Sequence, residues 1–320
     1  MPPSRASRRR LPLAQRRLAP VVARLLGPLL VAAIVGSSLT WASPAAAQAT
    51  APLAADELGV ITLIAGGLDT RSPEEPENTD VLILARIDVP NHTVRAVIVP
   101  RDLYVQIPGI GDDKITRAYD FGAKAADGDA VAGMDLVKQT VAANFGVEAD
   151  ACVLTTFDGF QQIVDALGGI DVENPYDLYD AEYPTIDYGS KEIFYPAGSL
   201  HLSGEQALEF ARTRHQDSDD GRTMRQQLLL RAMLQRVHDP GLGARIPSLA
   251  EKTRDAVRTD LTPSQQVALA VAAPAFRDED VTFTTLTPYL WGDTAPNGMW
   301  IYNGDWTQLR GIVQAALDGS

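Results

Sequence analysis

The stretch VLILARIDVPNHTVRAVIV, residues 81–99, decides the fold. Two apolar runs rich in valine, isoleucine and leucine, residues 81–87 and 94–99, flank a Pro90-Asn91 pair that suits a tight connection. Runs of this length and composition are typical of buried or half-buried β-strands. We therefore expect two consecutive strands joined by a short turn.

The rest of the chain mixes strand and helix patterns. Further strands are expected at residues 59–65, 152–156 and 281–286. Helices are expected at residues 130–145, 157–167, 204–212, 221–238, 246–258, 262–273 and 305–317, and Ser203 is placed to cap the third of them. Residues 174–199 are expected to be rich in loops. Because strands and helices intermix without an internal repeat, the sequence predicts the α/β class and one domain over residues 58–320.

The N-terminal segment has the pattern of an export signal. Residues 1–50 contain seven arginines and no acidic residue, and residues 25–42 are mostly apolar. Positive charge before an apolar stretch directs the downstream chain out of the cytoplasm. Residues 1–49 are thus expected to be a membrane anchor or a signal peptide with a small-residue cleavage site, and a linker is expected over residues 50–57. Both alternatives place the domain at the outer face of the cytoplasmic membrane or in the cell envelope.

The overall charge and the cysteine count exclude several classes of function. The formal net charge is -13 although the first 50 residues are basic, so the exported body is strongly acidic. A broad nucleic-acid-binding surface needs the opposite charge, and we expect no nucleic-acid partner. Cys152 is the only cysteine, which rules out an internal disulfide and a four-thiolate metal site.

Four arginines gather in the stretch RTRHQDSDDGRTMRQQ, residues 212–227. Arg212 and Arg214 would point one way from an extended segment, whereas Arg222, Arg225 and Gln226 would share one face of a helix. Guanidinium groups form forked hydrogen bonds to phosphate oxygens. The cluster therefore suggests a phosphate or pyrophosphate site. The alternative is an ion-pair network with the aspartates of the same stretch.

Acidic and basic residues also stand at the ends of the first strands. Asp69 and Asp80 flank a loop, where they could hold Mg²⁺ together with a substrate phosphate or could simply be turn and strand-start residues. Arg101, in the sequence Pro100-Arg101-Asp102, comes directly after an apolar strand, and ligands in α/β folds often bind there. The alternative for Arg101 is an exposed ion pair with Asp102.

Several long motifs occur together in one order. They are NTDVLILARID at 78–88, VPRDLYVQIPGIGDDKITRAY at 99–119, FDGFQQIVDALGGIDV at 157–172 and AGSLHLSGEQALEFARTRHQDSDDGRTMRQQ at 197–227. In these motifs the chain resembles the LytR-CpsA-Psr family of cell-envelope phosphotransferases. The resemblance implies a single α/β/α domain, with a central mixed β-sheet flanked by helices and an apolar pocket for a lipid tail.

The resemblance also implies a function and a set of site residues. The expected reaction moves a glycan polymer from a polyprenyl-pyrophosphate carrier at the membrane to a peptidoglycan acceptor, with Mg²⁺ as cofactor. Asp69 and Asp80 would be the metal-associated acids. The pyrophosphate-binding set would be Arg101, Lys114, Arg117, Arg212, Arg214, Arg222, Arg225 and Gln226. Catalytic roles would fall to Arg101, Arg212 and Arg214, with Asp102 or Asp219 as candidate base.

Two other functions fit the same residues. A polyprenyl-pyrophosphate-glycan hydrolase would use water in place of the sugar hydroxyl, and a non-catalytic binding module would only hold the lipid-linked glycan. For the tail pocket we expect apolar residues of the segments 137–145, 157–167 and 228–234.

Overall fold

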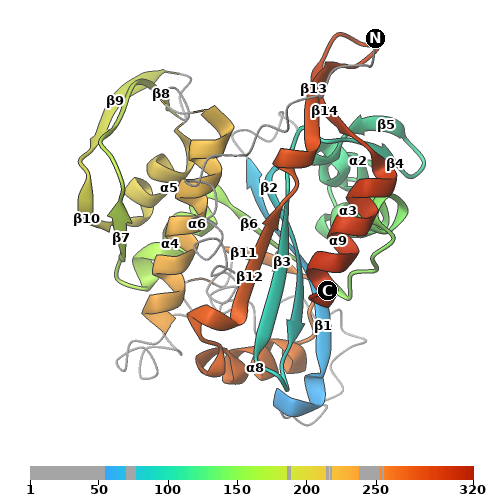
Figure 1. Cartoon of the computed structure of the whole chain (residues 1–320), viewed down its shortest axis with the longest axis horizontal. Coiled ribbons are helices and arrows are strands. Elements are labelled where there is room, and N and C mark those ends of the chain that lie inside the picture. The colour runs from blue at the N-terminus through green and yellow to red at the C-terminus, as the bar shows by residue number, and fades with distance from the viewer. Residues whose placement is uncertain are drawn as a thin grey trace, which may run out of the picture.

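The computed structural model describes residues 55–69, 77–185, 189–213, 216, 218–237, 253 and 256–320. Their centre is a mixed sheet in the order β11-β6-β1-β2-β3-β12 (Figure 1). Its strands are β1 (Val60–Asp69), β2 (Asn78–Asp88), β3 (Thr93–Val99), β6 (Ala151–Thr156), β11 (Val257–Thr259) and β12 (Val281–Thr285). The two strands expected from the stretch 81–99 are confirmed, as the antiparallel pair β2–β3.

Strand direction brings functional positions to one edge of this sheet. Strands β1 and β6 are parallel, β3 and β12 are parallel, and β2 runs antiparallel to both β1 and β3. The carboxyl ends of β1, β3, β6 and β12 therefore lie at the same edge as the start of β2. Ligand sites in α/β folds commonly form at such an edge.

Helices cover both faces of the sheet. One face packs against α4 (Phe157–Ala166), α5 (Gly204–Arg212), α6 (Ser218–Val237) and α8 (Pro263–Ala272). The other packs against α2 (Ala118–Ala125), α3 (Ala130–Phe145) and α9 (Trp306–Asp318). Figure 1 shows α4, α5 and α6 on one side of the strands, α2, α3 and α9 on the other, and α8 near the lower ends of the strands. The α/β class expected from the sequence pattern and the α/β/α arrangement implied by the family resemblance are confirmed.

Alternation along the strands explains why two cores form. Leu63 and Ala65 of β1 are buried against the α4–α6 layer, while Ile64 between them is buried against α2, α3 and α9. Because side chains alternate across a strand, one apolar run supplies both cores. This pattern is typical of a central strand covered on both faces.

Local capping signals set the helix starts. Ser203 and Gln206 form a capping box at the start of α5, and Thr262 and Gln265 form another at the start of α8. Each box satisfies backbone N–H groups that a helix start leaves open. The predicted cap at Ser203 is confirmed.

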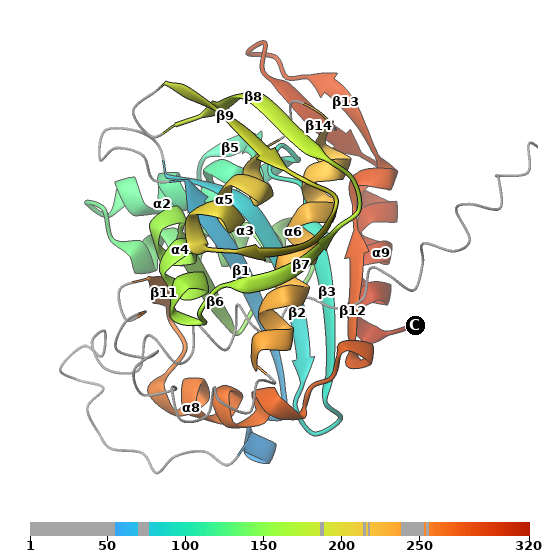
Figure 2. The same cartoon turned by 90° about the vertical axis from the view of Figure 1, so that its left-hand side faces the viewer.

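Two predictions about secondary structure were wrong. Residues 174–199 contain strands instead of only loops: β8 (Leu178–Pro184) and β9 (Ser190–Tyr195) form a hairpin, and β10 (Gly198–Leu202) pairs with β7 (Ile170–Asn174). The helix expected at 246–258 is contradicted at its C-terminal end, where β11 begins at Val257, whereas residues 246–252, 254 and 255 of that prediction lie outside the described residues. Figure 2 shows β7, β8 and β9 outside the α5 and α6 helices.

Two further hairpins lie at the edge of the sheet that holds the carboxyl ends of β1, β3, β6 and β12. They are β4 (Tyr104–Ile107) with β5 (Gly111–Lys114), and β13 (Leu290–Thr294) with β14 (Trp300–Gly304). Neither pair was expected from the sequence. In the described part of the chain, every helix is too short or too polar to cross a membrane. The export segment predicted at residues 1–49 and most of the linker lie outside the described residues.

Candidate functional site

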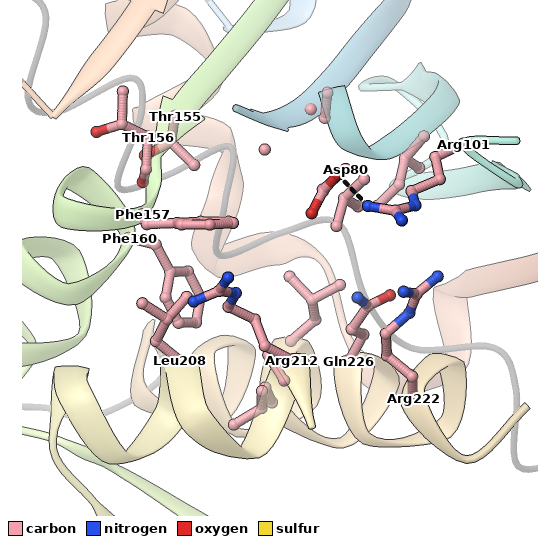
Figure 3. A pocket seen from close by; sticks show the side chains of 18 of the residues that line it. Asp80, Arg101, Thr155, Thr156, Phe157, Phe160, Leu208, Arg212, Arg222 and Gln226 are labelled. Carbon is pink, nitrogen blue, oxygen red and sulfur yellow. Dashed lines mark hydrogen bonds and ion pairs between the residues drawn. The ribbon is translucent and has the colours of Figure 1, made fainter. Parts of the chain in front are cut away.

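A cavity of about 210 Å³ lies between helices α4, α5 and α6 and the edge of the sheet where β1 and β6 end and β2 begins. Its floor is built from strand ends: Gly66 and Gly67 of β1, Val81 of β2, and Thr155 and Thr156 of β6. Helices α4, α5 and α6 supply the opposite wall (Figure 3). The cavity therefore lies at the carboxyl ends of the parallel strands, as the strand directions predict.

One part of the cavity is apolar. Its lining side chains are Phe157 and Phe160 of α4, Leu208 and Ala211 of α5, Leu229 and Leu230 of α6, and Val81 and Ile83 of β2. The segments predicted at 157–167 and 228–234 do contribute to the lining. The segment predicted at 137–145 does not, because α3 packs on the opposite face of the sheet with Val137, Val141 and Phe145 fully buried there.

The other part of the cavity is charged and centres on Asp80 and Arg101. The Arg101 Nη1 donates to Asp80 Oδ1 at 2.6 Å, and its Nε lies 3.4 Å from Asp102 Oδ2. Burial acts to lower the pKa of Arg101, but the neighbouring charges of Asp80 and Asp102 outweigh it and raise that pKa. The guanidinium is therefore held charged and fixed in direction beside the cavity.

A β-bulge explains why Asp80 reaches the cavity. Gly67 pairs with Val81, but the next residue, Leu68, pairs with Thr79, so Asp80 is the extra residue of β2. A bulge re-aims the side chains on either side of it. Asp80 and Val81 consequently both line the cavity, although neighbours in a regular strand point to opposite faces.

Arg212 is the last residue of α5 and lies against the aromatic wall. Its guanidinium carbon is 4.3 Å from the centre of the Phe157 ring, and Nη1 donates to Tyr183 Oη at 3.3 Å. Stacking on an aromatic face holds a guanidinium while its N–H groups still point outward from the edge of the group. Arg212 therefore lies where the charged and apolar parts of the cavity meet (Figure 3).

Helix α6 separates residues that were expected to act together. Arg222 and Gln226, four residues apart, both line the cavity. Arg225 does not: its side chain is 0% exposed, its Nε donates to the Phe210 carbonyl at 2.8 Å, and Nη2 donates to the Thr213 carbonyl. The prediction that Arg225 binds pyrophosphate is corrected. It faces the end of α5, where its hydrogen bonds to the two carbonyl groups fix the backbone on both sides of Arg212.

A second, smaller pocket continues from the charged part. It shares Asp80, Val81, Arg101, Arg222 and Gln226 with the first cavity. Its additional lining includes Asp102 together with Thr287, which comes after β12, and Tyr302 of β14. Thr287 and Tyr302 were not predicted from the sequence, and neither were Thr155 and Thr156. For Thr155, Thr156 and Thr287 the available signal was a position at or after a strand end. Tyr302 lies in the middle of β14, which was not expected from the sequence.

Lys114 and Arg117 lie beside the site and line neither pocket. Lys114 Nζ donates to Asp102 Oδ1 at 2.7 Å, so Asp102 is shared between two cations. Arg117 Nη1 donates to Asp113 Oδ2 at 2.7 Å, and its guanidinium lies 4.5 Å from the Phe121 ring centre. Lys114 thus orients Asp102, and the expected binding of pyrophosphate by Lys114 and Arg117 stays a prediction that the pocket linings do not support.

For two predicted site residues the structure does not describe the side chain. Arg214 lies outside the described residues, and of Asp219 only the backbone, in the first turn of α6, is described. Their roles remain predictions from the sequence.

The acidic residues near the cavity suit a metal that shares its ligands with substrate. Asp80 lines the cavity, and Asp69 ends the paired strand, opposite Asn78. In the part of the chain that the structure describes, no three acids, histidines or cysteines gather as a metal cage. Mg²⁺ is commonly held by one or two carboxylates, waters and substrate phosphates, and these two aspartates fit that donor set.

The chain matches proteins of known classes over most of its length. It is 32% identical over 267 residues to the Bacillus subtilis (strain 168) polyisoprenyl-teichoic acid--peptidoglycan teichoic acid transferase TagV, covering 80% of this chain and 64% of that protein. It is 32% identical to TagU of the same description from Oceanobacillus iheyensis, covering 77% of this chain and 72% of that protein. The chain thus spans about two thirds of the length of these relatives.

Solved structures share the fold. The crystal structure of B. subtilis TagV superimposes with a TM-score of 0.64 at 27% identity, covering 81% of this chain and 98% of that one. A structure described as TagT bound to LI-WTA gives a TM-score of 0.62 at 23% identity, covering 81% and 90%. The LytR_cpsA_psr family model matches residues 43–317. The chain belongs to the LytR_cpsA_psr family.

Proposed function

We propose that this protein is an extracytoplasmic phosphotransferase that moves a glycan polymer from a polyprenyl-pyrophosphate carrier to peptidoglycan. The observation that carries the proposal is that one cavity combines an arginine-lined end with an apolar wall. A prenyl diphosphate has the same two parts, an anionic head and an apolar tail. The names of the 32%-identical TagV and TagU relatives support the same reaction class.

The charged end supplies what phosphoryl transfer needs most, which is positioning and neutralisation of charge. Arg101 and Arg222 would hold the phosphate oxygens, and Gln226 would add an uncharged donor. Arg212 would lie where the proximal phosphate meets the tail. When bound by Asp69 and Asp80, Mg²⁺ would further neutralise the phosphate oxygens.

The reaction itself replaces the phosphoanhydride bond of the diphosphate with a phosphate ester bond to the acceptor sugar. The oxygen of an acceptor sugar hydroxyl attacks the phosphorus that bears the glycan. The bond from that phosphorus to the bridging oxygen breaks, and polyprenyl phosphate leaves with the bond's electron pair. The hydroxyl proton passes to a base. Asp102 is a candidate for that base, and its two carboxylate oxygens already accept hydrogen bonds from Arg101 and Lys114.

A direct transfer assay tests the proposal. The full chain is incubated with a synthetic prenyl-diphosphate oligosaccharide and soluble peptidoglycan fragments. We expect the glycan phosphate to become covalently linked to the fragments, detected as a mass increase that survives removal of lipid. Free glycan phosphate without linkage would instead establish a hydrolase, and binding without turnover would establish a binding module.

Mg²⁺ removal is the first prediction from this proposal. Because the ion would neutralise phosphate charge, chelation with EDTA is expected to lower the transfer rate by at least about tenfold, and added Mg²⁺ should restore it. Asp80→Asn should require a higher Mg²⁺ concentration for half-maximal rate. Asp318→Asn, which removes an exposed ion-pair partner of Arg86, serves as the control and should leave that concentration unchanged. A rate indifferent to EDTA would remove the metal from the proposal.

Blocking the apolar part is the second prediction. Ala211 lines the cavity next to Arg212, and an Ala211→Trp side chain would fill part of the 210 Å³ available to a tail. We expect the KM for a long-chain prenyl substrate to rise on the order of tenfold, with a smaller change for a short-chain analogue. Ala211→Ser, which adds little volume, should leave the KM unchanged for both substrates. Equal losses for both chain lengths would show that the tail lies elsewhere.

A further inference from the structure

The β13–β14 hairpin carries aromatic side chains that the proposed phosphate and tail sites do not use. Trp300 is 48% exposed although it is large and apolar, and Tyr302, two residues on, lines the second pocket. The two rings pack edge to face with their centres 4.6 Å apart. Exposed aromatic residues that lie together beside a pocket commonly mark a binding surface.

Strand register places the two rings on one face of the hairpin. Thr294 pairs with Trp300 and Gly292 pairs with Tyr302, so these four residues share a face. Trp291 pairs with Asn303 and therefore points to the opposite face. Only the Trp300 face is thus continuous with Tyr302 and the second pocket.

Gly292 allows the Trp300 indole to lie across the neighbouring strand. A Cβ added at Gly292 would come within 3.2 Å of Trp300 Nε1. One side of the indole therefore covers the backbone of β13, and the ring is supported as a flat surface. A fixed aromatic ring can bind a flat ligand at a low cost in side-chain entropy.

The hairpin is anchored directly to the charged site. The Tyr302 backbone N–H donates to the Asp102 carbonyl at 2.8 Å, and Tyr302 forms a β-bridge with Leu103. Asp102 is the neighbour of Arg101, whose guanidinium lines both pockets. The aromatic pair therefore keeps a fixed position relative to the proposed phosphate site.

The orientation of the bound prenyl diphosphate decides which of its groups contacts this aromatic surface. If the tail occupies the apolar cavity, the group on the distal phosphate points toward the second pocket. The lining of that pocket combines charged and polar residues with Tyr302 and with apolar residues of β2 and β3. That group is a sugar. The apolar C–H face of a pyranose ring stacks on an aromatic ring, while its hydroxyl groups hydrogen-bond to polar neighbours such as Thr287.

We propose that Trp300 and Tyr302 form a stacking surface for the first sugar rings of the donor glycan. This inference rests on the proposed function, because it takes the diphosphate to lie at Arg101 and Arg222. It adds a subsite that reads the saccharide, separate from the groups that hold phosphate and lipid.

Binding measurements on the full chain separate the two claims. The probes are farnesyl diphosphate and the same molecule extended by a disaccharide on the distal phosphate. We expect the unaltered protein to bind the disaccharide-bearing probe on the order of five- to tenfold more tightly. Trp300→Ala should abolish this difference and leave the affinity for farnesyl diphosphate unchanged. Trp300→Phe, which keeps a flat ring, should retain most of it.

Trp291→Ala is the matched control, since Trp291 is 50% exposed on the other face of the same hairpin. It should leave both affinities as they are. A disaccharide advantage that persists in Trp300→Ala overturns the stacking surface, and so does an equal loss for both probes. If Trp300→Ala instead weakens only the binding of soluble peptidoglycan fragments, the surface belongs to the acceptor and the inference is wrong. Failure of the unaltered protein to bind farnesyl diphosphate would overturn the proposed function itself.

Discussion

Arg101→Ala is expected to lower the glycan transfer rate by on the order of 10²- to 10³-fold, the largest effect on activity that we predict. Arg101 lines both pockets and is held by ion pairs to Asp80 and Asp102. A fixed charge acts on developing negative charge without having to reorganise during the reaction. The transfer assay with prenyl-diphosphate oligosaccharide and peptidoglycan fragments, run at saturating substrate, measures the loss.

Two variants establish that the loss arises at the phosphate site. Arg101→Lys keeps the charge but not the forked geometry, so it should recover only part of the rate. Arg86→Ala removes another arginine of the same sheet, paired with Asp318 at the surface, and should leave the rate unchanged within about twofold. If Arg101→Ala retains a rate close to that of the unaltered protein, Arg101 does not stabilise the transferred phosphate.

Regular elements could be predicted from the sequence because their signals are local. The β2 and β3 strands were predicted from two apolar runs, and the start of α5 was predicted from Ser203 and the residue three positions later. The β8–β9 hairpin could not be found in this way. Its strands are rich in charged and tyrosine residues, and it is stabilised by contacts to distant α5, such as the ion pair of Lys191 with Glu209.

The site residues also divide into those with a local sequence signal and those whose position depends on distant contacts. Arg101 and Arg222 were predicted from their position at a strand end and in a helix, and the structure brings both to one pocket. The position of Asp80 depends on a bulge, which the sequence does not signal. The burial of Arg225 depends on how α6 sits against α5. Sequence spacing gives the helical face but not which neighbour that face meets.

Arg225→Met is expected to lower the free energy of unfolding by about 3–5 kcal/mol, the largest effect on stability that we predict. The guanidinium is fully buried and bonds to the carbonyl oxygens of Phe210 and Thr213. Methionine fills much of the volume but donates no hydrogen bond, so both acceptors lose a charged donor inside the protein. Chemical denaturation followed by circular dichroism measures the change.

Arg222→Met provides the comparison one helical turn away. Arg222 lines the cavity and is partly exposed, so its loss should change stability by less than about 1 kcal/mol while it weakens binding of prenyl diphosphate strongly. The two arginines of one motif would then separate, one acting on the ligand and the other on the backbone beside Arg212. An Arg225→Met protein of unchanged stability that no longer binds diphosphate would reverse this assignment and return Arg225 to the phosphate site.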